Sequence, residues 1–528
     1  MSENKHFKTT FLYYKAIFHR FVFFVAIMLL LLGIPFCRPL MTIGGIVLVA
    51  NWFLEGKFIE KWNRLKNNRI LFASLCLFAV YFIWFFLTDN YQEAWKDIWM
   101  KTPFLFMPII FASSQPLSRI EINHLLKVYL IGLLISSVYG MLVFQLDSHL
   151  IDKREIAVFI SYIRFEMNLC FAIAVAVYLI FQKEEKKYVK CLLSFYLMWL
   201  FFLVFYIGAL TAIILLVSIG VLLILKKVVE TKNRFYRIAL PLVFFAFIAT
   251  FVVYTTVLIK QYYTVDFVVA KADKYTAEGN LYTHNIEHSL IENGSYVLAY
   301  VCEDELRSEW NKRSTIDFED RKKTLIRYLN SKGLRKDKAG VLQLSDEDIR
   351  HIEKGVANVV YLDNFGFKAR LYGLLWELSD YNKSKKVSGY TLPQRFELWK
   401  NAYALFLKHP WVGVGTGDAK DAFAEQLYLS NSSLKDTEKL SHNQYFFFLI
   451  QFGIVGFAII LFSLLYPVIA SRKWQNNLFL AFLIIMFIAM LTDDTLERQD
   501  GVTFFAFFNA FFLFLFPFTS RKEKTTIN

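Results

Sequence analysis

The chain contains little of what usually builds a disulfide-bonded, metal-binding or repeat protein. Its 528 residues include five cysteines, and the long polar segment that follows residue 260 holds only Cys302. No disulfide can therefore form within that segment. The sequence also has no Cys-x-x-Cys pair and no cluster of His, Cys and carboxylate residues at metal-ligand spacing. Internal repeats and low-complexity segments are missing as well. We expect a site that needs no metal and no cofactor.

Positive charge is not gathered into one basic patch. The net charge of +14 is spread over short Lys/Arg clusters that separate apolar runs, which indicates membrane topology and argues against nucleic-acid binding. Hydrophobic residues make up 56% of the chain, with 56 phenylalanines, whereas soluble domains have about 45–50%. This composition predicts an all-α polytopic membrane protein, with the lipid bilayer as its surroundings.

Runs of about 20 apolar residues predict the spanning helices. The first run lacks a small-residue cleavage site and continues into further spans, so we expect a retained helix and no signal peptide. About twelve spans are expected, at residues 18–36, 39–55, 70–88, 97–113, 125–146, 165–181, 190–206, 208–225, 238–259, 443–470, 477–491 and 502–518.

The basic loops predict the orientation. With twelve spans counted, the Lys/Arg clusters near residues 5–20, 57–69, 183–190, 226–237, 472–473 and 521–524 all fall on one side. Lys and Arg accumulate in cytoplasmic loops, so both termini are expected to be cytoplasmic.

The other side receives one segment that is long enough to form a domain. We therefore expect four parts, namely an N-terminal bundle of about nine helices (1–259), an outer loop domain between the ninth and tenth helices (260–442), about three C-terminal helices (443–518) and a cytoplasmic tail (519–528). The loop domain is expected to be mostly helical. "STIDFEDRKKTLIRYLNSKG" and "LSDEDIRHIEKG" both begin with capping residues and end with glycine.

Polar residues at the outer ends of the spans are candidates for function. Arg164 starts the sixth span, Arg395 lies in "LPQRFELWK", His442 starts the tenth span, and "TDDTLERQDG" precedes the last span. Ionisable groups at membrane depth are costly and are often functional. Each also has a structural interpretation, because Arg164 could snorkel to the interface, Arg395 could be a solvated helix residue, and the acidic segment could be a plain polar turn.

"GVGTGD" (413–418) allows two interpretations. Its glycines, Gly413, Gly415 and Gly417, could form a backbone nest for an anion, with Asp418 capping the next helix, or they could form a tight turn. The segment does not fit a nucleotide-binding pattern, because no strand precedes it and no Gly-Lys-Ser/Thr follows.

"SHNQYFFFLIQFGIVG" (441–456) also allows two interpretations of its polar start. Ser441 and Gln444 have the spacing of a capping box, which needs no function. The box leaves His442 unexplained at the first helical position, where the helix dipole favours neutral imidazole, the form that a general base requires. Gly453 and Gly456 share one helix face and could admit a neighbouring helix.

Taken together, these segments resemble the O-antigen ligase and polymerase family of integral membrane glycosyltransferases. The resemblance rests on "HPWVGVGTGD" followed by "SHNQYFFFLIQFGIVG", and it extends to "IRFEMNLCFAI", "QRFELWKNAY" and "MLTDDTLERQDGVTFF". Their order covers most of residues 20–518, and the specificity lies in the combination.

The resemblance implies a bacterial inner-membrane enzyme of lipopolysaccharide biosynthesis, with residues 260–442 in the periplasm. It would transfer a glycan from undecaprenyl diphosphate to a sugar hydroxyl of lipid A–core or of a nascent glycan, with inversion and without metal. His442 would act as general base, and Arg164 and Arg395 would clamp the diphosphate, since arginine binds phosphate oxygens bidentately. Further residues expected to bind substrate are Asn443, Lys439, Gly413, Gly415, Gly417, Asp494, Glu497 and Arg498.

Several functions share this signature. A ligase is favoured by the size and helical character of the loop domain, and the alternatives are an O-antigen or exopolysaccharide polymerase and a protein O-oligosaccharyltransferase. A polysaccharide transporter is a weaker alternative from another class, because such folds usually show repeated halves and broken intramembrane helices with buried charges, and we expect neither here.

Overall fold

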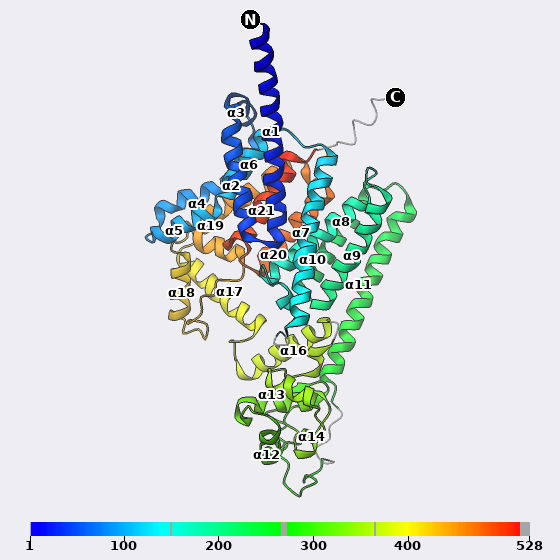
Figure 1. The fold of residues 1–528 in the computed structure, drawn as a ribbon. Coiled ribbons are helices and arrows are strands. Elements are labelled where there is room, and N and C mark those ends of the chain that lie inside the picture. The colour runs from blue at the N-terminus through cyan, green and yellow to red at the C-terminus, as the bar shows by residue number, and fades with distance from the viewer. Residues whose placement is uncertain (1, 148–149, 151, 266–271, 364–365, 518–528) are drawn as a thin grey trace.

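The computed structural model describes residues 2–147, 150, 152–265, 272–363 and 366–517, with side chains from residue 13 onward. The described chain is built almost entirely of helices (Figure 1). The N-terminal half contains α1 (Ser2–Phe36), α2 (Arg38–Glu55), α3 (Phe58–Leu65), α4 (Arg69–Trp84), α5 (Tyr91–Lys101), α6 (Pro103–Ser113), α7 (Arg119–Leu146), α8 (Tyr162–Ile180), α9 (Lys187–Ile207), α10 (Leu210–Glu230) and α11 (Arg234–Tyr263).

The second half begins with a short hairpin of β1 (Ile291–Glu292) and β2 (Ser295–Tyr296), which is the one sheet among the described residues. It continues with α12 (Glu303–Arg313), α13 (Phe318–Ser331), α14 (Lys338–Leu342), α15 (Asp346–Glu353), α16 (Gly366–Ser384), α17 (Thr391–Lys408), α18 (Ala419–Leu429), α19 (Gln444–Ala470), α20 (Asn477–Thr492) and α21 (Gln499–Ala510). A π-helical turn, Phe511–Leu515, extends α21.

The expectation of an all-α polytopic membrane protein is confirmed. Eight helices in the described part of the chain are long and apolar enough to cross a membrane, and a ninth span results if α2 and α3, bent by 111°, count as one. Helices α20 and α21 are shorter and apolar, and the expected span 97–113 is divided at Thr102 between α5 and α6. A helix occupies each expected span, but the count of twelve stays a prediction.

Aromatic packing holds α8, α20 and α21 at the centre of the bundle. The rings of Phe171 and Phe508 lie 4.5 Å apart between centroids, and Phe482 and Phe508 lie 5.9 Å apart. Edge-to-face and offset ring pairs stabilise a core beyond the area they bury. By contrast, α11 lies at the outside of the bundle, where few of its side chains are buried (Figure 1).

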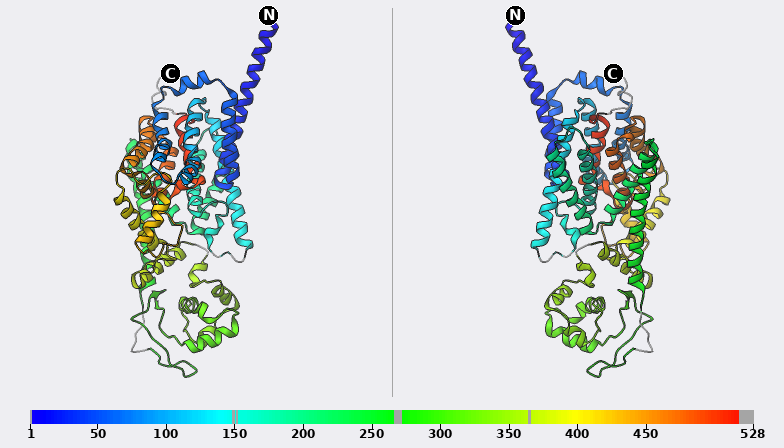
Figure 2. Two further views of the ribbon diagram at one scale, coloured as in Figure 1. Left: turned by 90° about the vertical axis from the view of Figure 1, so that its left-hand side faces the viewer. Right: turned by 90° about the vertical axis from the view of Figure 1, so that its right-hand side faces the viewer.

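The residues of the segment expected as a loop domain are divided among separate hydrophobic cores. Residues of α12, α13 and α15 share a core around Trp310, Phe318 and Leu325. This unit lies at the end of the molecule opposite the N-terminal helix (Figure 2). Helices α17 and α18 instead share a core with the start of α19, through Leu398, Phe423 and Phe447.

The two helices expected from capping grammar are present. Asp317 caps α13, where its side chain accepts a bond from the amide of Glu319. Ser345 and Asp348 form a capping box at the start of α15. Gly333 and Gly355 follow the two helices with φ of 69° and 87°, a backbone conformation that glycine adopts without steric cost.

Candidate functional site

The residues before α19 are held by one carboxylate from a distant loop. Asp494 accepts hydrogen bonds from the Ser441 hydroxyl (2.7 Å), the His442 amide (2.7 Å) and the Asn443 amide (3.1 Å). Asp494 lies in the connection between α20 and α21, and it is 6% exposed. Hydrogen bonds donated to a charged acceptor are stronger than those between two neutral groups. The conformation of residues 441–443 is therefore set by the acidic segment and not by α19 alone.

His442 stands just outside the helix, in a left-handed backbone conformation with φ of 48°. Its side chain is 34% exposed, and its Nδ1 lies 3.7 Å from Asp493 Oδ1 and 3.8 Å from Asp494 Oδ2. These distances exceed a hydrogen bond, but they allow a charge interaction. No hydrogen bond joins Nε2 to another described residue. The Nδ1 edge of the imidazole thus lies near two carboxylates, while the side chain remains partly exposed.

The expected capping box is wrong. Asn443 caps α19, because its Oδ1 accepts bonds from the amides of Tyr445 (3.0 Å) and Phe446 (3.2 Å). Gln444 faces the acidic segment instead, donating to Glu497 (2.8 Å) and accepting from the Leu496 amide (2.7 Å). The physical reason is that Asp494 takes the Ser441 hydroxyl, so His442 lies before the helix and not at its first position.

Arg164, at the start of α8, is buried and paired with acids. Its guanidinium lies 3.2 Å from Asp493 Oδ2 and 3.3 Å from Asp500 Oδ1, and it donates to the Ser161 hydroxyl at 2.7 Å. It is 4% exposed. The snorkelling interpretation is therefore wrong, and the group that meets Arg164 here is the acidic segment.

The acidic segment itself is not a plain polar turn, since Asp493, Asp494, Glu497 and Asp500 are all buried. Arg498 is the exposed member, and its guanidinium makes no hydrogen bond or ion pair with another described residue. It nevertheless lies close enough to Asp493 to favour its ionised form.

The pKa values of the neighbouring Asp493 and Asp494 are shifted in opposite directions. Burial alone would raise the pKa of Asp493, but His442 and Arg164 outweigh burial and hold that pKa below its ordinary value. Burial raises the pKa of Asp494, and the nearby Asp493 charge raises it further. Asp493 is thus the firmly ionised neighbour of His442, and Asp494 is held by the donors of residues 441–443.

A buried lysine fixes the far end of the segment. Lys101 is fully buried at the end of α5, 3.0 Å from Glu497 Oε2 and 3.4 Å from Asp97 Oδ1, and it also donates to the Leu496 carbonyl. Glu497 in turn bonds Gln444 of α19. This network joins α5, the acidic segment and α19. Sequence reasoning missed Lys101, which lies within the expected span 97–113, one of the two least certain spans.

The glycine turn packs against the middle of α19. The amides of Val414 and Gly415 each donate at 3.0 Å, to the carbonyls of Ile450 and Gln451. Further amides follow, since Thr416 donates to Trp84 and Gly417 to Thr88. The amides that an anion would need are occupied, so the tight-turn interpretation holds. Asp418 does not cap α18, because it accepts from the amides of Asp89 and Asn90.

This packing breaks α19. Gly453 has φ of 61°, and a Cβ there would lie 2.4 Å from the Trp411 backbone, while a Cβ on Gly413 would lie 2.5 Å from that of Gln451. The missing side chain at Gly453 thus lets another segment approach α19 closely, but that segment is the loop around Trp411 and not a neighbouring helix. We expected no broken intramembrane helix with buried charge. That expectation is wrong here, because α19 is broken at Gly453 and the nearby Gln451 side chain donates to the buried carboxylate of Asp97 at 3.2 Å.

Two cations expected at the site, Arg395 and Lys439, have no acidic partner among the described residues. Arg395, in the second turn of α17, is partly buried, and it makes no hydrogen bond or ion pair with a described residue. Lys439, three residues before His442, donates to the Gln394 side chain beside Arg395. This hydrogen bond and the packing of Trp399 near Phe446 hold α17 close to the start of α19.

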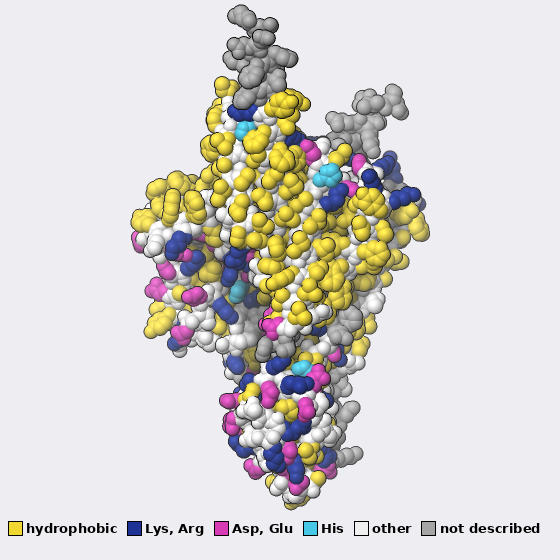
Figure 3. All heavy atoms as spheres, viewed as in Figure 1, with side chains coloured by type: hydrophobic (Ala, Val, Ile, Leu, Met, Phe, Trp, Pro, Cys, Tyr) yellow, Lys and Arg dark blue, Asp and Glu magenta, His cyan; other side chains and the backbone are white. Residues whose placement is uncertain are grey.

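A basic cavity of about 490 Å³ adjoins the first turn of α17. It contains Arg154 and Arg370, and Arg370 donates to the Thr391 hydroxyl at 3.4 Å. Burial and the neighbouring Arg154 charge lower the pKa of Arg370, and the nearby carboxylates of Glu377 and Asp152 do not offset them. Figure 3 shows Lys and Arg side chains around the hollow between the bundle and the loop domain. No motif in the sequence marks these residues.

Metal ligation has no support in the described residues, which contain no group of three or more His, Cys, Asp or Glu arranged to hold an ion. The nearby carboxylates are instead held by Arg164, Lys101 and backbone amides. The expectation of a metal-independent site stays a prediction.

The segment that carries this site matches a known family. Residues 355–461, which include α16, α17 and α18 of the segment 260–442 and extend into α19, match the family model described as O-antigen ligase. Arg395, Lys439 and His442 lie within the match, whereas Arg164 and the acidic segment lie outside it. No curated protein matches the chain. This match and the multiple apolar helices support a place for the chain in the O-antigen ligase family.

Proposed function

We propose that the protein transfers a glycan from undecaprenyl diphosphate to a sugar hydroxyl, as an O-antigen ligase with lipid A–core as acceptor. His442 accepts the proton of the attacking hydroxyl, and the anomeric carbon inverts as the diphosphate leaves. The observation that carries the proposal is the state of His442, whose Nδ1 lies near two carboxylates and whose backbone is held by Asp494.

The carboxylates support a general base. When imidazole takes up a proton it becomes a cation, and the adjacent Asp493 charge stabilises that cation. Asp494 restrains the backbone on both sides of the imidazole, so that little orientation is lost when the acceptor binds.

The cations support a diphosphate leaving group. Charge on the diphosphate grows as the glycosidic bond breaks, and preorganised cations stabilise that charge. Arg395 meets the requirement because no acid occupies it among the described residues, and Lys439 and the exposed Arg498 add positive charge at the same mouth. The basic cavity at Arg154 and Arg370 suits a further phosphorylated part of donor or acceptor.

The other residues assigned from the sequence divide into two groups. Arg164, Asn443, Asp494 and Glu497 hold the loop and the start of α19, so we propose them as positioning residues in this state. For Arg164 to clamp the diphosphate as well, the guanidinium would have to exchange Asp493 for phosphate. Gly413, Gly415 and Gly417 would act on substrate only indirectly, through the path of the turn along α19.

The proposed location is the cell inner membrane, with both termini cytoplasmic. Residues 260–442 would be periplasmic, and the polysaccharide would be transferred at the outer mouth of the bundle. Basic loops between spans support this orientation.

The test uses the purified full chain in vesicles with lipid-linked glycan donor and lipid A–core. Transfer to lipid A–core, undiminished by chelator, supports the proposal. Extension of glycan on the carrier lipid with unmodified lipid A–core would instead identify a polymerase, and transfer to a protein would identify an oligosaccharyltransferase. Donor movement across the vesicle without transfer would identify a transporter.

A further inference from the structure

A second basic cavity lies at the end of the bundle opposite the loop domain, where α1, α2, α3 and the end of α6 meet (Figure 1). Its volume is about 170 Å³. Four cations line it, Arg20, Lys57, Lys61 and Arg64, against the two carboxylates Glu55 and Glu60. The lining therefore carries a net charge of +2, and it is separate from the His442 site.

The floor of the cavity is already neutral. Lys61 is 6% exposed, lies 3.0 Å from Glu55 Oε2, and donates to the Trp52 carbonyl at 2.5 Å. Its ammonium also lies over the Trp52 ring, 4.7 Å from the centroid. Because Glu55 is satisfied by Lys61, it offers little repulsion to an anion bound above it.

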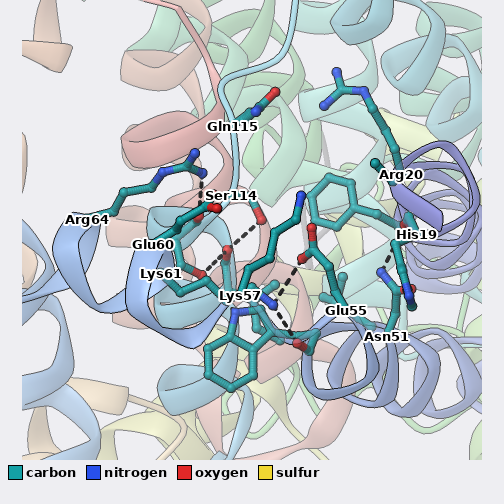
Figure 4. Close-up of a pocket in the computed structure, with 16 residues that line it drawn as sticks. His19, Arg20, Asn51, Glu55, Lys57, Glu60, Lys61, Arg64, Ser114 and Gln115 are labelled. Carbon is teal, nitrogen blue, oxygen red and sulfur yellow. Dashed lines mark hydrogen bonds and ion pairs between the residues drawn. The ribbon is translucent and has the colours of Figure 1, made fainter. Parts of the chain in front are cut away.

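The rim retains unused cationic donors. The Lys57 ammonium makes no hydrogen bond or ion pair with a described residue. Arg64 gives one bond, to the Ser113 carbonyl at 2.8 Å, which leaves other N–H groups of its guanidinium available. Arg20 is paired with Glu121 at 2.7 Å. Figure 4 shows the side chains of Arg20, Lys57 and Arg64 around the opening, with Gln115 at the edge.

The surroundings of the opening suit lipid. The 111° bend between α2 and α3 turns α3 across the end of the bundle. Ile59, Trp62 and Phe58 of α3 are 80%, 63% and 51% exposed, while Lys61 and Arg64 face the cavity. A short helix with apolar and basic faces lies in the membrane interface, and tryptophan favours that level.

We propose that this cavity binds the phosphate headgroup of an anionic diacyl phospholipid, with its acyl chains beside the apolar face of α3. Basic pockets between spanning helices recognise anionic headgroups in this way. The +2 lining favours an anionic over a zwitterionic headgroup. This inference does not depend on glycan transfer, since it concerns another part of the molecule.

The test measures lipid binding to the delipidated full chain by native mass spectrometry. Phosphatidylglycerol should bind at least about fivefold more tightly than phosphatidylcholine with the same acyl chains. The double variant Lys57→Gln/Arg64→Gln should lose that preference. The matched control Lys183→Gln/Lys187→Gln removes the same charge from the α8–α9 connection, outside the cavity lining, and should keep it.

Three results would overturn the proposal. Equal binding of the two lipids would show that headgroup charge is not recognised. Equal loss in both double variants would show general attraction to a basic surface. A thermal stabilisation by inorganic phosphate, equal to that by phosphatidylglycerol and lost in the Lys57/Arg64 variant, would identify a free-phosphate site. Size-exclusion profiles matching the wild type exclude misfolding as the cause of lost binding.

Discussion

The carboxylate of Asp494 accepts the backbone amide of His442 at 2.7 Å, across 52 residues of sequence. The same carboxylate accepts from Ser441 and Asn443. In Asp494→Asn, one side-chain oxygen becomes an amide nitrogen that faces N–H donors, and each buried donor left unpaired costs about 1–3 kcal/mol. We predict that glycan transfer falls by at least about tenfold, mainly in kcat. The control Asp421→Asn, at an exposed acceptor of Asn90, should retain activity. Equal activity in both variants would mean that Asp494 does not position His442.

Lys101 should be essential for stability because it is the fully buried partner of Glu497 and Asp97. Removing one member of a buried ion pair costs about 3–5 kcal/mol, since the remaining charge is uncompensated. Lys101→Met should therefore lower the melting temperature of the detergent-solubilised protein. The double variant Lys101→Met/Glu497→Gln should recover part of the loss. A double variant no more stable than the single one would contradict this electrostatic explanation.

Gly453 is predicted to tolerate no side chain. Gly453→Ala places a Cβ 2.4 Å from the Trp411 backbone at a φ of 61°, so the turn and α19 must separate. The matched control is Gly373→Ala in α16, where a Cβ meets nothing within 4 Å. Thermal unfolding should show a loss in the first variant and no loss, or a small gain, in the second. Equal melting temperatures would mean that the break in α19 is not maintained.

Arg395→Lys keeps the charge but loses the planar fork that grips two phosphate oxygens. We predict a fall of at least about tenfold in kcat/KM for the lipid-linked donor. The melting temperature should not change, because the Arg395 guanidinium makes no hydrogen bond or ion pair with a described residue. Exposed Lys400→Gln on the same helix is the control. Unchanged kinetics in Arg395→Lys would return Arg395 to the status of a solvated helix residue.

Asp348 gives a pH-dependent contribution within the loop domain. Although burial raises its pKa, bonds from Lys332, Tyr328 and Ser345 outweigh burial and lower the pKa to about 2. A depressed carboxyl pKa adds stability above the unfolded value near 4, and that stability is lost as pH falls from about 4 towards 2. Hydrogen exchange in α13 and α15 should be slower in wild type than in Asp348→Asn at pH 6, and the difference should shrink near pH 3. A difference independent of pH would rule out ionisation as its source.

The sequence predicts local features well and distant partners poorly. The capping residues of α13 and α15 lie within four residues of the backbone amides that donate to them, so the pattern is sufficient. The combination of Arg395, the glycine turn and His-Asn predicts a resemblance to the O-antigen ligase family, which the match over residues 355–461 supports. Those inferences use contacts close in sequence, or motif order.

The wrong predictions for the helix cap and for Arg164 have a common physical cause. Ser441 and Gln444 have the spacing of a capping box, but Asp494 and Glu497, more than 50 residues away, compete for the same side chains and win. Arg164 was expected to be free for phosphate, yet Asp493 and Asp500 surround it. Spacing along the chain contains no information on such partners.

The central claim is that His442 is the general base, and the most direct test compares His442→Ala with His409→Ala in the reconstituted transfer assay. His409 is an exposed histidine within the same family segment, at the end of α17. The account predicts that His442→Ala loses about 10²–10⁴-fold in kcat, the usual contribution of a general base, with unchanged melting temperature, while His409→Ala keeps wild-type activity. Transfer by His442→Ala at the wild-type rate would contradict the account.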